Sequence, residues 1–385
     1  MGGSSLREVY LDNSATTRTD PDVAEVALER MTASYGNPSS LHAKGTEAHL
    51  LLERARGQLA NALGCEPGEV YFTAGGTEAN NLALLGAFGA HRRRASGIVS
   101  GKTEHASVLA PLARLKEQGA DITLAGSLPD GCADPEELLA AVGESSLLLS
   151  CGLVNGELGG IAPIAEIAKA AKAKAPRLLL HCDAIQALGK LPVSVKKLGV
   201  DLLSVSGHKL HAPKGIGALY IRRGVRIHPL LFGGGQEQGM RPGTESLPLA
   251  CAFGAAAEKM TGQITQTLER FENLREYFVK RAQAMAGLCI NSPPQAAPYI
   301  CNISAPGFPG QPMLRFLAER GVYVSTGSAC AKGKESHVLS AVGLPPERIQ
   351  SALRVSLCKD NTIEDLDAFF TALEQGRNHL ARSRL

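Results

Sequence analysis

The sequence predicts an α/β protein with a mostly parallel central sheet, helices on both of its faces, and a smaller α+β domain. Between about residues 65 and 225, short apolar runs rich in β-branched residues alternate with segments of helical periodicity. Strands separated by single helices run parallel and are buried on both faces. Beyond about residue 290, a few short strands and helices follow a different order.

The elements of the large sheet can be assigned in order. Seven strands are expected from apolar runs at residues 70–72, 98–100, 122–124, 147–150, 178–181, 202–205 and 218–221. Helical patterns lie between them at residues 80–88, 106–118, 135–142 and 164–173. Asp134 followed by Pro135 is typical of an N-cap and a first-turn proline, and Asp20 with Pro21 opens an earlier helix in the same way.

The last third of the chain begins with a helical stretch at residues 248–286, whose middle is rich in charges at helical spacing. Short strands are expected near residues 299–303, 322–325 and 354–356, and helices at 312–320 and 363–378. These elements predict a large domain at residues 16–260. They also predict a small domain that combines residues 1–15 with 261–385.

The composition is that of a globular protein, because 44% of the 385 residues are hydrophobic and 20% are charged. A formal charge of +3 predicts no direct nucleic-acid partner. The longest nearly apolar stretch, 247–257, is shorter than the roughly 20 residues that span a bilayer, so no membrane contact is predicted. The first residues show no signal-peptide pattern. We therefore expect a cytoplasmic protein.

Nine cysteines stand at positions 65, 132, 151, 182, 251, 289, 301, 330 and 358, and no two form a C-x-x-C pair. An odd and scattered set argues against a disulfide framework, and its spacing argues against a zinc ribbon. No metal site is predicted. We expect reduced thiols, most of them packing as small apolar residues.

Ligands bind open parallel sheets at the carboxyl ends of the strands, where five of the predicted strands run into polar clusters. After residue 72, Gly76 permits close backbone approach and Thr77 adds a hydroxyl at a helix start, which suits a phosphate. An ordinary glycine turn capped by threonine is the alternative. His105 and Asn155 follow two other strands, and a packed histidine and a simple β-turn are their alternatives.

Asp183 leaves a buried strand and needs a partner, either a protonated ring nitrogen of a cofactor or the N–H groups of a helix start. Lys209 follows the strand at 202–205, and burial lowers the pKa of a lysine amine as Schiff-base formation requires. Lys214 is the competing candidate; Lys209 is favoured because it lies nearer the strand end, flanked by Ser206 and His208. A phosphate cup, a stacking ring, an acid and a Schiff-base lysine together match pyridoxal 5′-phosphate.

The sequence resembles the cysteine desulfurases of the NifS/IscS type, which belong to the class V aminotransferase family and have the pyridoxal-phosphate-dependent transferase fold type I. The resemblance covers nearly the whole chain. Its motifs occur in the family's order at residues 10–17, 36–40, 75–78, 103–105, 183–186, 206–209, 233–237, 241–245, 325–330 and 354–356.

The resemblance implies a role for each matching residue. Lys209 would bind the cofactor covalently, His105 would stack on its ring and assist proton transfer, and Asp183 would pair with the ring nitrogen. The other implied contacts are Gln186 at the phenolic oxygen, Thr77, Ser206 and His208 at the phosphate, Thr244 from the second subunit of a homodimer, and Asn155 and Arg354 at the substrate carboxylate.

Cys330 would be the catalytic nucleophile. Small residues surround it, and two nearby lysines, Lys332 and Lys334, favour its thiolate. The implied reaction converts L-cysteine to L-alanine and leaves a persulfide on Cys330. A sulfur-acceptor protein, either an iron–sulfur scaffold or a tRNA thiolation enzyme, would then take the sulfur. Residues 331–335 form a segment about two residues shorter than is usual in the family, which predicts a shorter reach toward that acceptor.

Two other functions are alternatives to the desulfurase. A selenocysteine lyase, or another class V lyase, would use the same cofactor residues on a related substrate. A non-catalytic sulfur-transfer or assembly partner would keep the fold without turnover. The presence of Lys209, Asp183 and Cys330 argues against this second alternative.

Overall fold

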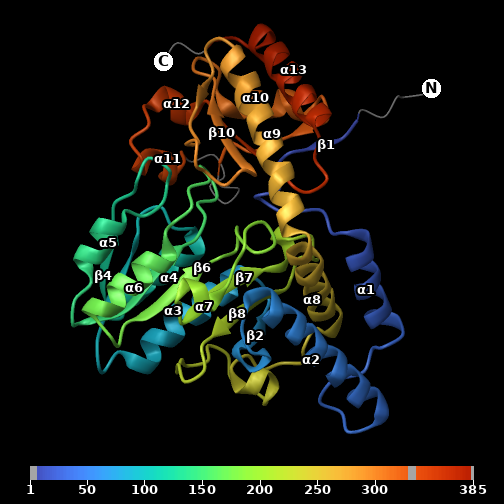
Figure 1. Cartoon of the computed structure of the whole chain (residues 1–385), viewed down its shortest axis with the longest axis vertical. Coiled ribbons are helices and arrows are strands. Elements are labelled where there is room, and N and C mark those ends of the chain that lie inside the picture. The colour runs from blue at the N-terminus through green and yellow to red at the C-terminus, as the bar shows by residue number, and fades with distance from the viewer. Residues whose placement is uncertain (1–6, 328–334, 383–385) are drawn as a thin grey trace.

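The structure, a computed structural model, describes residues 7–327 and 335–382. A seven-stranded sheet occupies the lower half of the molecule in Figure 1, and the C-terminal elements lie above it. Across this sheet the strand order is β2 (Val70–Thr73), β8 (Gly217–Ile221), β7 (Leu202–Ser206), β6 (Leu179–Asp183), β5 (Ser146–Gly152), β3 (Gly97–Gly101) and β4 (Asp121–Ala125). All seven strands expected from the sequence are present.

The sheet is mostly parallel, as the sequence predicts. Strands β7, β6, β5, β3 and β4 pair in parallel. Within the described residues, β8 is the one strand of this sheet that runs against its neighbours, β2 and β7. Parallel strands therefore bring five carboxyl ends to one edge.

Helices cover both faces of the sheet. Successive strand residues alternate between two hydrophobic cores: Leu148 packs in one core and Leu149 in the other. The helices that pack in the core of Leu148 are α3 (Gly76–His91) and α4 (Ala106–Glu117). The helices of the core of Leu149 include α1 (Pro21–Thr32), α2 (Ala43–Leu63), α5 (Pro135–Ala141), α6 (Ile164–Lys174), α7 (Val195–Leu198) and α8 (Leu247–Gly262).

The helical stretch expected at residues 248–286 is two helices, so the expectation of one continuous helix is wrong. Helix α8 ends at Gly262 and α9 (Ile264–Ala284) begins after Gln263, whose φ of −108° and ψ of 13° are not helical. Glycine has low helix propensity, and the two halves have different partners. Helix α8 packs against α1 and α2, whereas α9 packs against β9 and α13.

The C-terminal part contains a three-stranded antiparallel sheet in the order β12 (Ala352–Ser356), β10 (Ile300–Ser304) and β9 (Cys289–Ile290). Its helices are α10 (Gly310–Ala318), α11 (His337–Ala341), α12 (Pro346–Gln350) and α13 (Ile363–His379). Stacked and tilted aromatic rings fill its core, with Phe278 at 6.0 Å from Phe369 and 5.1 Å from Phe370 between ring centroids.

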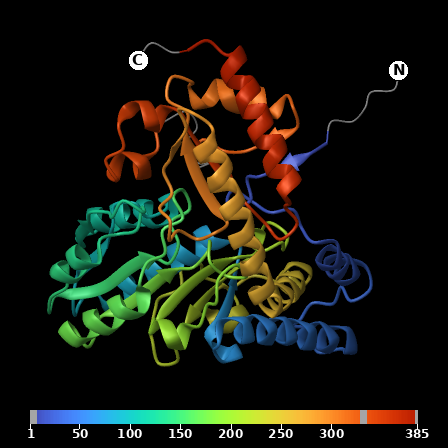
Figure 2. The ribbon, with the colours of Figure 1, turned by 45° about the horizontal axis from the view of Figure 1, so that its top comes forward.

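The N-terminal strand joins this C-terminal part. Strand β1 (Val9–Tyr10) pairs in parallel with β11 (Val322–Tyr323), and Figure 2 shows β1, in blue, beside the orange and red elements.

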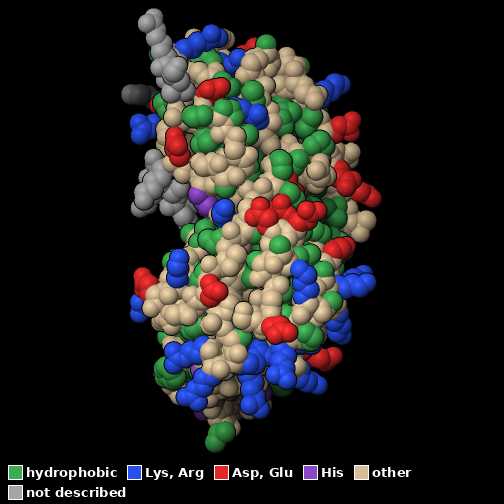
Figure 3. All heavy atoms as spheres, turned by 90° about the vertical axis from the view of Figure 1, so that its left-hand side faces the viewer, with side chains coloured by type: hydrophobic (Ala, Val, Ile, Leu, Met, Phe, Trp, Pro, Cys, Tyr) green, Lys and Arg blue, Asp and Glu red, His purple; other side chains and the backbone are tan. Residues whose placement is uncertain are grey.

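The space-filling view is hollowed at its left edge, between the upper and lower parts (Figure 3). The division into domains at residues 1–15, 16–260 and 261–385 stays a prediction. No helix in the described ranges is both long and apolar enough to cross a bilayer.

Candidate active site

A cavity of about 940 Å³ opens at the carboxyl edge of the large sheet. Nine residues predicted for the site line it together: Thr77, His105, Asn155, Asp183, Gln186, Ser206, His208, Lys209 and Arg354. They come from the ends of several strands, from the helix starts that follow them, and from β12 of the C-terminal part. The topology thus gathers residues that lie far apart in the sequence.

One end of the cavity suits a phosphate. The N-cap of α3 is Gly75, which has no side chain to cap the first N–H groups of the helix. A Cβ at Gly76 would lie 2.2 Å from Ile185 Cδ1, so a side chain there would displace its neighbour. The buried Ser206 Oγ has no hydrogen-bond partner among the described residues. Unsatisfied donors at a helix N-terminus form a ready anion site.

His208 lies at the same end as a neutral ring. Burial, together with the neighbouring cations Lys209 and Lys214, lowers its pKa to about 4. Its Nδ1 lies 3.2 Å from Thr16 Oγ1. We infer that His208 meets a phosphate as a hydrogen-bonding group rather than as a positive charge.

Asp183 is held rigidly at the end of β6. Its Oδ2 accepts a hydrogen bond of 2.7 Å from Asn80 Nδ2, and its Oδ1 accepts one of 3.0 Å from the Ile185 N–H. Asn80 is itself fully buried and also donates to Ser107 Oγ at 2.9 Å. A carboxylate held in this way keeps its charge in one place, where a protonated ring nitrogen could pair with it.

His105 is the N-cap of α4, and this role sets its tautomer. Its Nδ1 accepts the Ser107 backbone N–H at 3.1 Å, which leaves the proton of the neutral ring on Nε2. Burial lowers the pKa of His105, the Asp183 carboxylate opposes this shift, and Lys209 adds to it. The ring is therefore neutral at pH 7 and suited to stacking.

Both lysines considered from the sequence line the cavity, but only Lys209 is partly buried; Lys214 is exposed. Lys209 Nζ donates to the carbonyl oxygens of Ser14 and Ala15, the second at 2.8 Å. Gln186 Nε2 donates to the same Ser14 oxygen at 2.9 Å. The backbone at residues 14 and 15 therefore holds the two side chains together.

Arg354 and Asn155 are held by different means. The Arg354 guanidinium is 3% exposed, donates to Asp12 Oδ1 at 2.7 Å and to the Gly156 carbonyl at 3.0 Å, and has no described partner at Nε. Asn155 Oδ1 accepts the N–H groups of Glu157 and Leu158, each at 2.9 Å. Asn155 thus caps the turn that presents the Gly156 carbonyl to the arginine.

Glu104 is a site residue to which the sequence analysis assigned no role. It lines the cavity, is 7% exposed, and its Oε1 accepts the Gly152 N–H at 2.9 Å. Burial raises the pKa of Glu104 to about 8; the Gly152 hydrogen bond opposes the rise and the Asp183 carboxylate adds to it. In the sequence, the one signal that Glu104 belongs to the site was its position between Thr103 and His105, which line the cavity.

Thr244 and Cys330 stand apart from the other predicted residues. Thr244 is exposed and does not line this cavity; it borders a smaller pocket with Glu237 and Arg241. Its segment is anchored by Glu237, whose carboxylate makes two hydrogen bonds to Arg56 of α2, at 2.7 and 2.8 Å. Cys330, with the Lys332 and Lys334 considered beside it, lies outside the described residues.

The eight described cysteines are free thiols, and six of them are buried. Burial raises the pKa of Cys301 to about 11 and the pKa of Cys65 to about 12, although the Arg275 guanidinium opposes the shift at Cys301. The thiols of Cys65 and Cys301 are therefore protonated at neutral pH and unreactive. The six buried cysteines confirm the expectation that most pack as small apolar residues.

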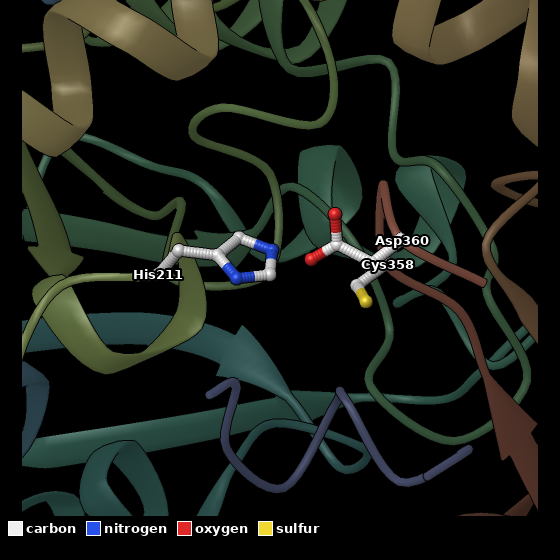
Figure 4. Close-up of side chains that lie close together, drawn as sticks. All are labelled: His211, Cys358 and Asp360. Carbon is white, nitrogen blue, oxygen red and sulfur yellow. The ribbon is translucent and has the colours of Figure 1, made fainter. Parts of the chain in front are cut away.

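A second cluster contains side chains of metal-binding types. The ligand atoms of His211, Cys358 and Asp360 lie within 4.8 Å of one another, and the Asp360 carboxylate points toward the His211 ring (Figure 4). The Lys359 ammonium already pairs with Asp360 Oδ1 at 2.9 Å, and burial raises the pKa of the Cys358 thiol. We assign no ion to this cluster.

Comparisons with known proteins show the family to which the chain belongs. The sequence profile of the family described as "Aminotransferase class-V" matches residues 9–369. The chain is 41% identical over 364 residues to a cysteine desulfurase IscS of Methanosarcina thermophila, covering 94% of this chain and 90% of that protein. A solved NifS-like protein matches with a TM-score of 0.92 and 36% identity, covering 97% and 100% of the two chains. SspA, solved in complex with cysteine, matches with a TM-score of 0.81 and 31% identity, covering 91% and 99%.

Proposed function

Because the chain belongs to the aminotransferase class-V family, we propose that it is a pyridoxal 5′-phosphate-dependent cysteine desulfurase. It converts L-cysteine to L-alanine and holds the released sulfur as a persulfide on Cys330. The observation that carries this proposal is the meeting of nine predicted site residues in one cavity. The similarity to SspA, which was solved with cysteine, supports the substrate.

The residues around the cavity fit the family's cofactor. The uncapped start of α3 and the unpartnered Ser206 Oγ would hold its phosphate, and Asp183 would pair with its ring nitrogen. Thr77 and His208 lie at the phosphate end and Gln186 lies beside Lys209, the residue for covalent attachment. When bound, pyridoxal phosphate withdraws electrons from the substrate Cα and makes its proton acidic.

The protein's own groups bind the substrate and move its protons. The buried Arg354 guanidinium binds the carboxylate of L-cysteine through the charge-assisted hydrogen bonds that suit arginine. Asn155 supports it by holding the turn at Gly156. Lys209 Nζ removes the α-proton, and the neutral His105, with its proton on Nε2, stacks on the ring and assists.

The sulfur step is assigned to Cys330 from its sequence motif. Its thiolate attacks the substrate sulfur, so that an S–S bond forms while the substrate C–S bond breaks. The electron pair of the broken bond stays with the substrate carbon, and a proton completes L-alanine. The persulfide then passes to a sulfur-acceptor protein, for which we propose an iron–sulfur scaffold, with a tRNA thiolation enzyme as the alternative.

We also propose a homodimer, in which the partner's copy of the Thr244 segment completes the phosphate site. Thr244 is exposed in the single chain, and the nearby Leu231 and Phe232 are 50% and 89% exposed. Exposed apolar side chains beside a predicted intersubunit contact favour burial by a second copy. We place the protein in the cytoplasm, where the thiols of the eight described cysteines would stay reduced.

The test measures alanine and sulfide released from L-cysteine by the purified holoenzyme in the presence of a reductant. Cys330→Ala should retain the visible absorption of the bound cofactor and lose sulfide release. Cys289→Ala, which changes a half-buried thiol in β9, is the matched control and should behave as wild type. Sulfide release at the wild-type rate from Cys330→Ala would contradict the assigned nucleophile.

A further inference from the structure

Lys190 is a buried cation to which the function described above gives no role. It follows β6 in the segment that also carries Asp183 and Gln186, and it is 5% exposed. It does not line the cavity. Lysine is almost never buried without a specific interaction, so its position requires an explanation.

Its amine faces the back of the Gln186 side chain. Lys190 Nζ donates to Gln186 Oε1 at 3.5 Å, the long end of the hydrogen-bond range, and lies 5.1 Å from the centre of the Tyr299 ring. The Tyr299 hydroxyl donates to the Gln186 backbone carbonyl at 2.8 Å. The lysine and the tyrosine thus hold the side chain and the backbone of the same glutamine.

This contact and the Ser14 carbonyl together fix which way the Gln186 amide points. An amide has a donor end and an acceptor end of nearly the same shape, so its orientation depends on its partners. With Oε1 turned to Lys190, Nε2 is turned toward the Ser14 carbonyl, which also accepts from Lys209. A chain of polar contacts therefore runs from Lys190 through Gln186 to the reactive lysine.

Charge connects the same residues. Burial, together with the neighbouring cations Lys209 and Arg354, lowers the pKa of Lys190 to about 7, and Cys358 opposes the shift. The charge of Lys190 in turn contributes to lowering the pKa of His208 and of His211. Because the pKa of Lys190 lies near neutrality, its amine loses its charge as the pH rises above about 7, whereas its contact with Gln186 Oε1 needs only an N–H donor.

We propose that Lys190 is a positioning residue for the reaction: it orients the Gln186 amide toward the cofactor. The inference rests on the proposed function, since that function gives Gln186 and Lys209 their contacts with the cofactor. It adds a residue outside the cavity that acts through Gln186 inside it.

The test follows the visible absorption of the cofactor bound to the holoenzyme as the pH is changed. Lys190→Met removes the charge and the donor while keeping an unbranched side chain. Without the Lys190 donor, the Gln186 amide no longer holds its Nε2 toward the phenolic oxygen of the cofactor; that oxygen then holds the neighbouring proton more tightly, so the pH midpoint of the absorption change should rise by about one unit. Lys196→Met, which changes an exposed lysine on α7, is the matched control and should keep the wild-type midpoint.

A double variant separates a positioning role of Lys190 from a general structural role. If Lys190 acts through Gln186, part of its effect on the midpoint should disappear when Lys190→Met is combined with Gln186→Leu. Folding is followed separately by urea unfolding. Lys190→Met should resist urea at least as well as wild type at pH 6, where a buried ammonium costs the most.

The outcomes are distinguishable. A wild-type midpoint in Lys190→Met overturns the inference while leaving the desulfurase proposal intact, provided that wild type makes alanine from cysteine. A full shift in Lys190→Met that persists unchanged in the Gln186→Leu background overturns the orienting role. Failure of the wild-type protein to bind the cofactor overturns both proposals.

Discussion

Replacing Glu104 with glutamine should make the stability of the protein less sensitive to pH. In the folded chain, burial keeps the Glu104 carboxyl protonated up to a pKa of about 8, against an ordinary value of 4.5. Between these two pH values the folded protein binds a proton that the unfolded chain releases. The free energy of unfolding therefore falls as the pH rises from about 4.5 to about 8.

The size of the effect follows from the shift. One pKa unit corresponds to about 1.36 kcal/mol, so this single group removes at most about 3.5 kcal/mol between pH 5 and pH 8. Glutamine keeps the oxygen that accepts the Gly152 N–H and cannot lose a proton. Any new cost of burying its amide is the same at every pH, so the slope is the informative quantity.

The assay is urea unfolding of the cofactor-free protein at several pH values from 5 to 8, because bound cofactor would add a pH dependence of its own. The gap between the Glu104→Gln and wild-type free energies should widen in favour of the variant as the pH rises. Glu144→Gln makes the same chemical change at an exposed position and is the matched control. Parallel curves for Glu104→Gln and wild type would refute the argument.

Two further predictions concern stability. Glu237→Ala should lower the free energy of unfolding by about 3–5 kcal/mol, because the buried Arg56 guanidinium loses its main partner. Urea unfolding measures this loss of stability. A loss below about 1 kcal/mol would contradict the pairing of Glu237 with Arg56. Gly217→Ala would place a Cβ 2.6 Å from the Gly75 backbone and 2.8 Å from the Val205 carbonyl. It should cost about 1–3 kcal/mol in the same assay and also weaken cofactor binding, since it moves the start of α3; an unchanged cofactor affinity would argue against that movement.

Most strands of the large sheet could be predicted because each is a short apolar run whose two faces are both buried; the edge strand β4 is the exception, since Asp121, Thr123 and Leu124 are exposed. Leu148 and Leu149, for example, pack on opposite sides, so the run is continuous rather than alternating. Helix α2 received no prediction, although it is 21 residues long. Glycines at positions 45 and 57 and a histidine N-cap obscure its pattern, and its stability comes from packing against α8.

Most of the candidate site could be predicted from one rule, the position of ligands at the carboxyl ends of parallel strands. The rule needs the strand ends only, which the sequence shows. The supporting contacts could not be predicted in this way. Asn80 donates a hydrogen bond to Asp183 although the two residues are 103 positions apart in the sequence. The environment of Lys190 likewise depends on Tyr299, whose ring lies under the lysine amine. Such roles depend on tertiary neighbours that no local pattern encodes.

The pairing of the first strand with the last third of the chain has a consequence for how the protein is made. Arg354 binds Asp12 across 342 positions, and β1 completes its pairing only with β11. Residues 14 to 16 line the cavity together with Arg354, so the N-terminal segment and strand β12 must come together before the cavity is complete. Long-range contacts of this kind form late in folding. During synthesis, the N-terminal segment must therefore wait for nearly the whole chain to leave the ribosome before the cavity can be assembled.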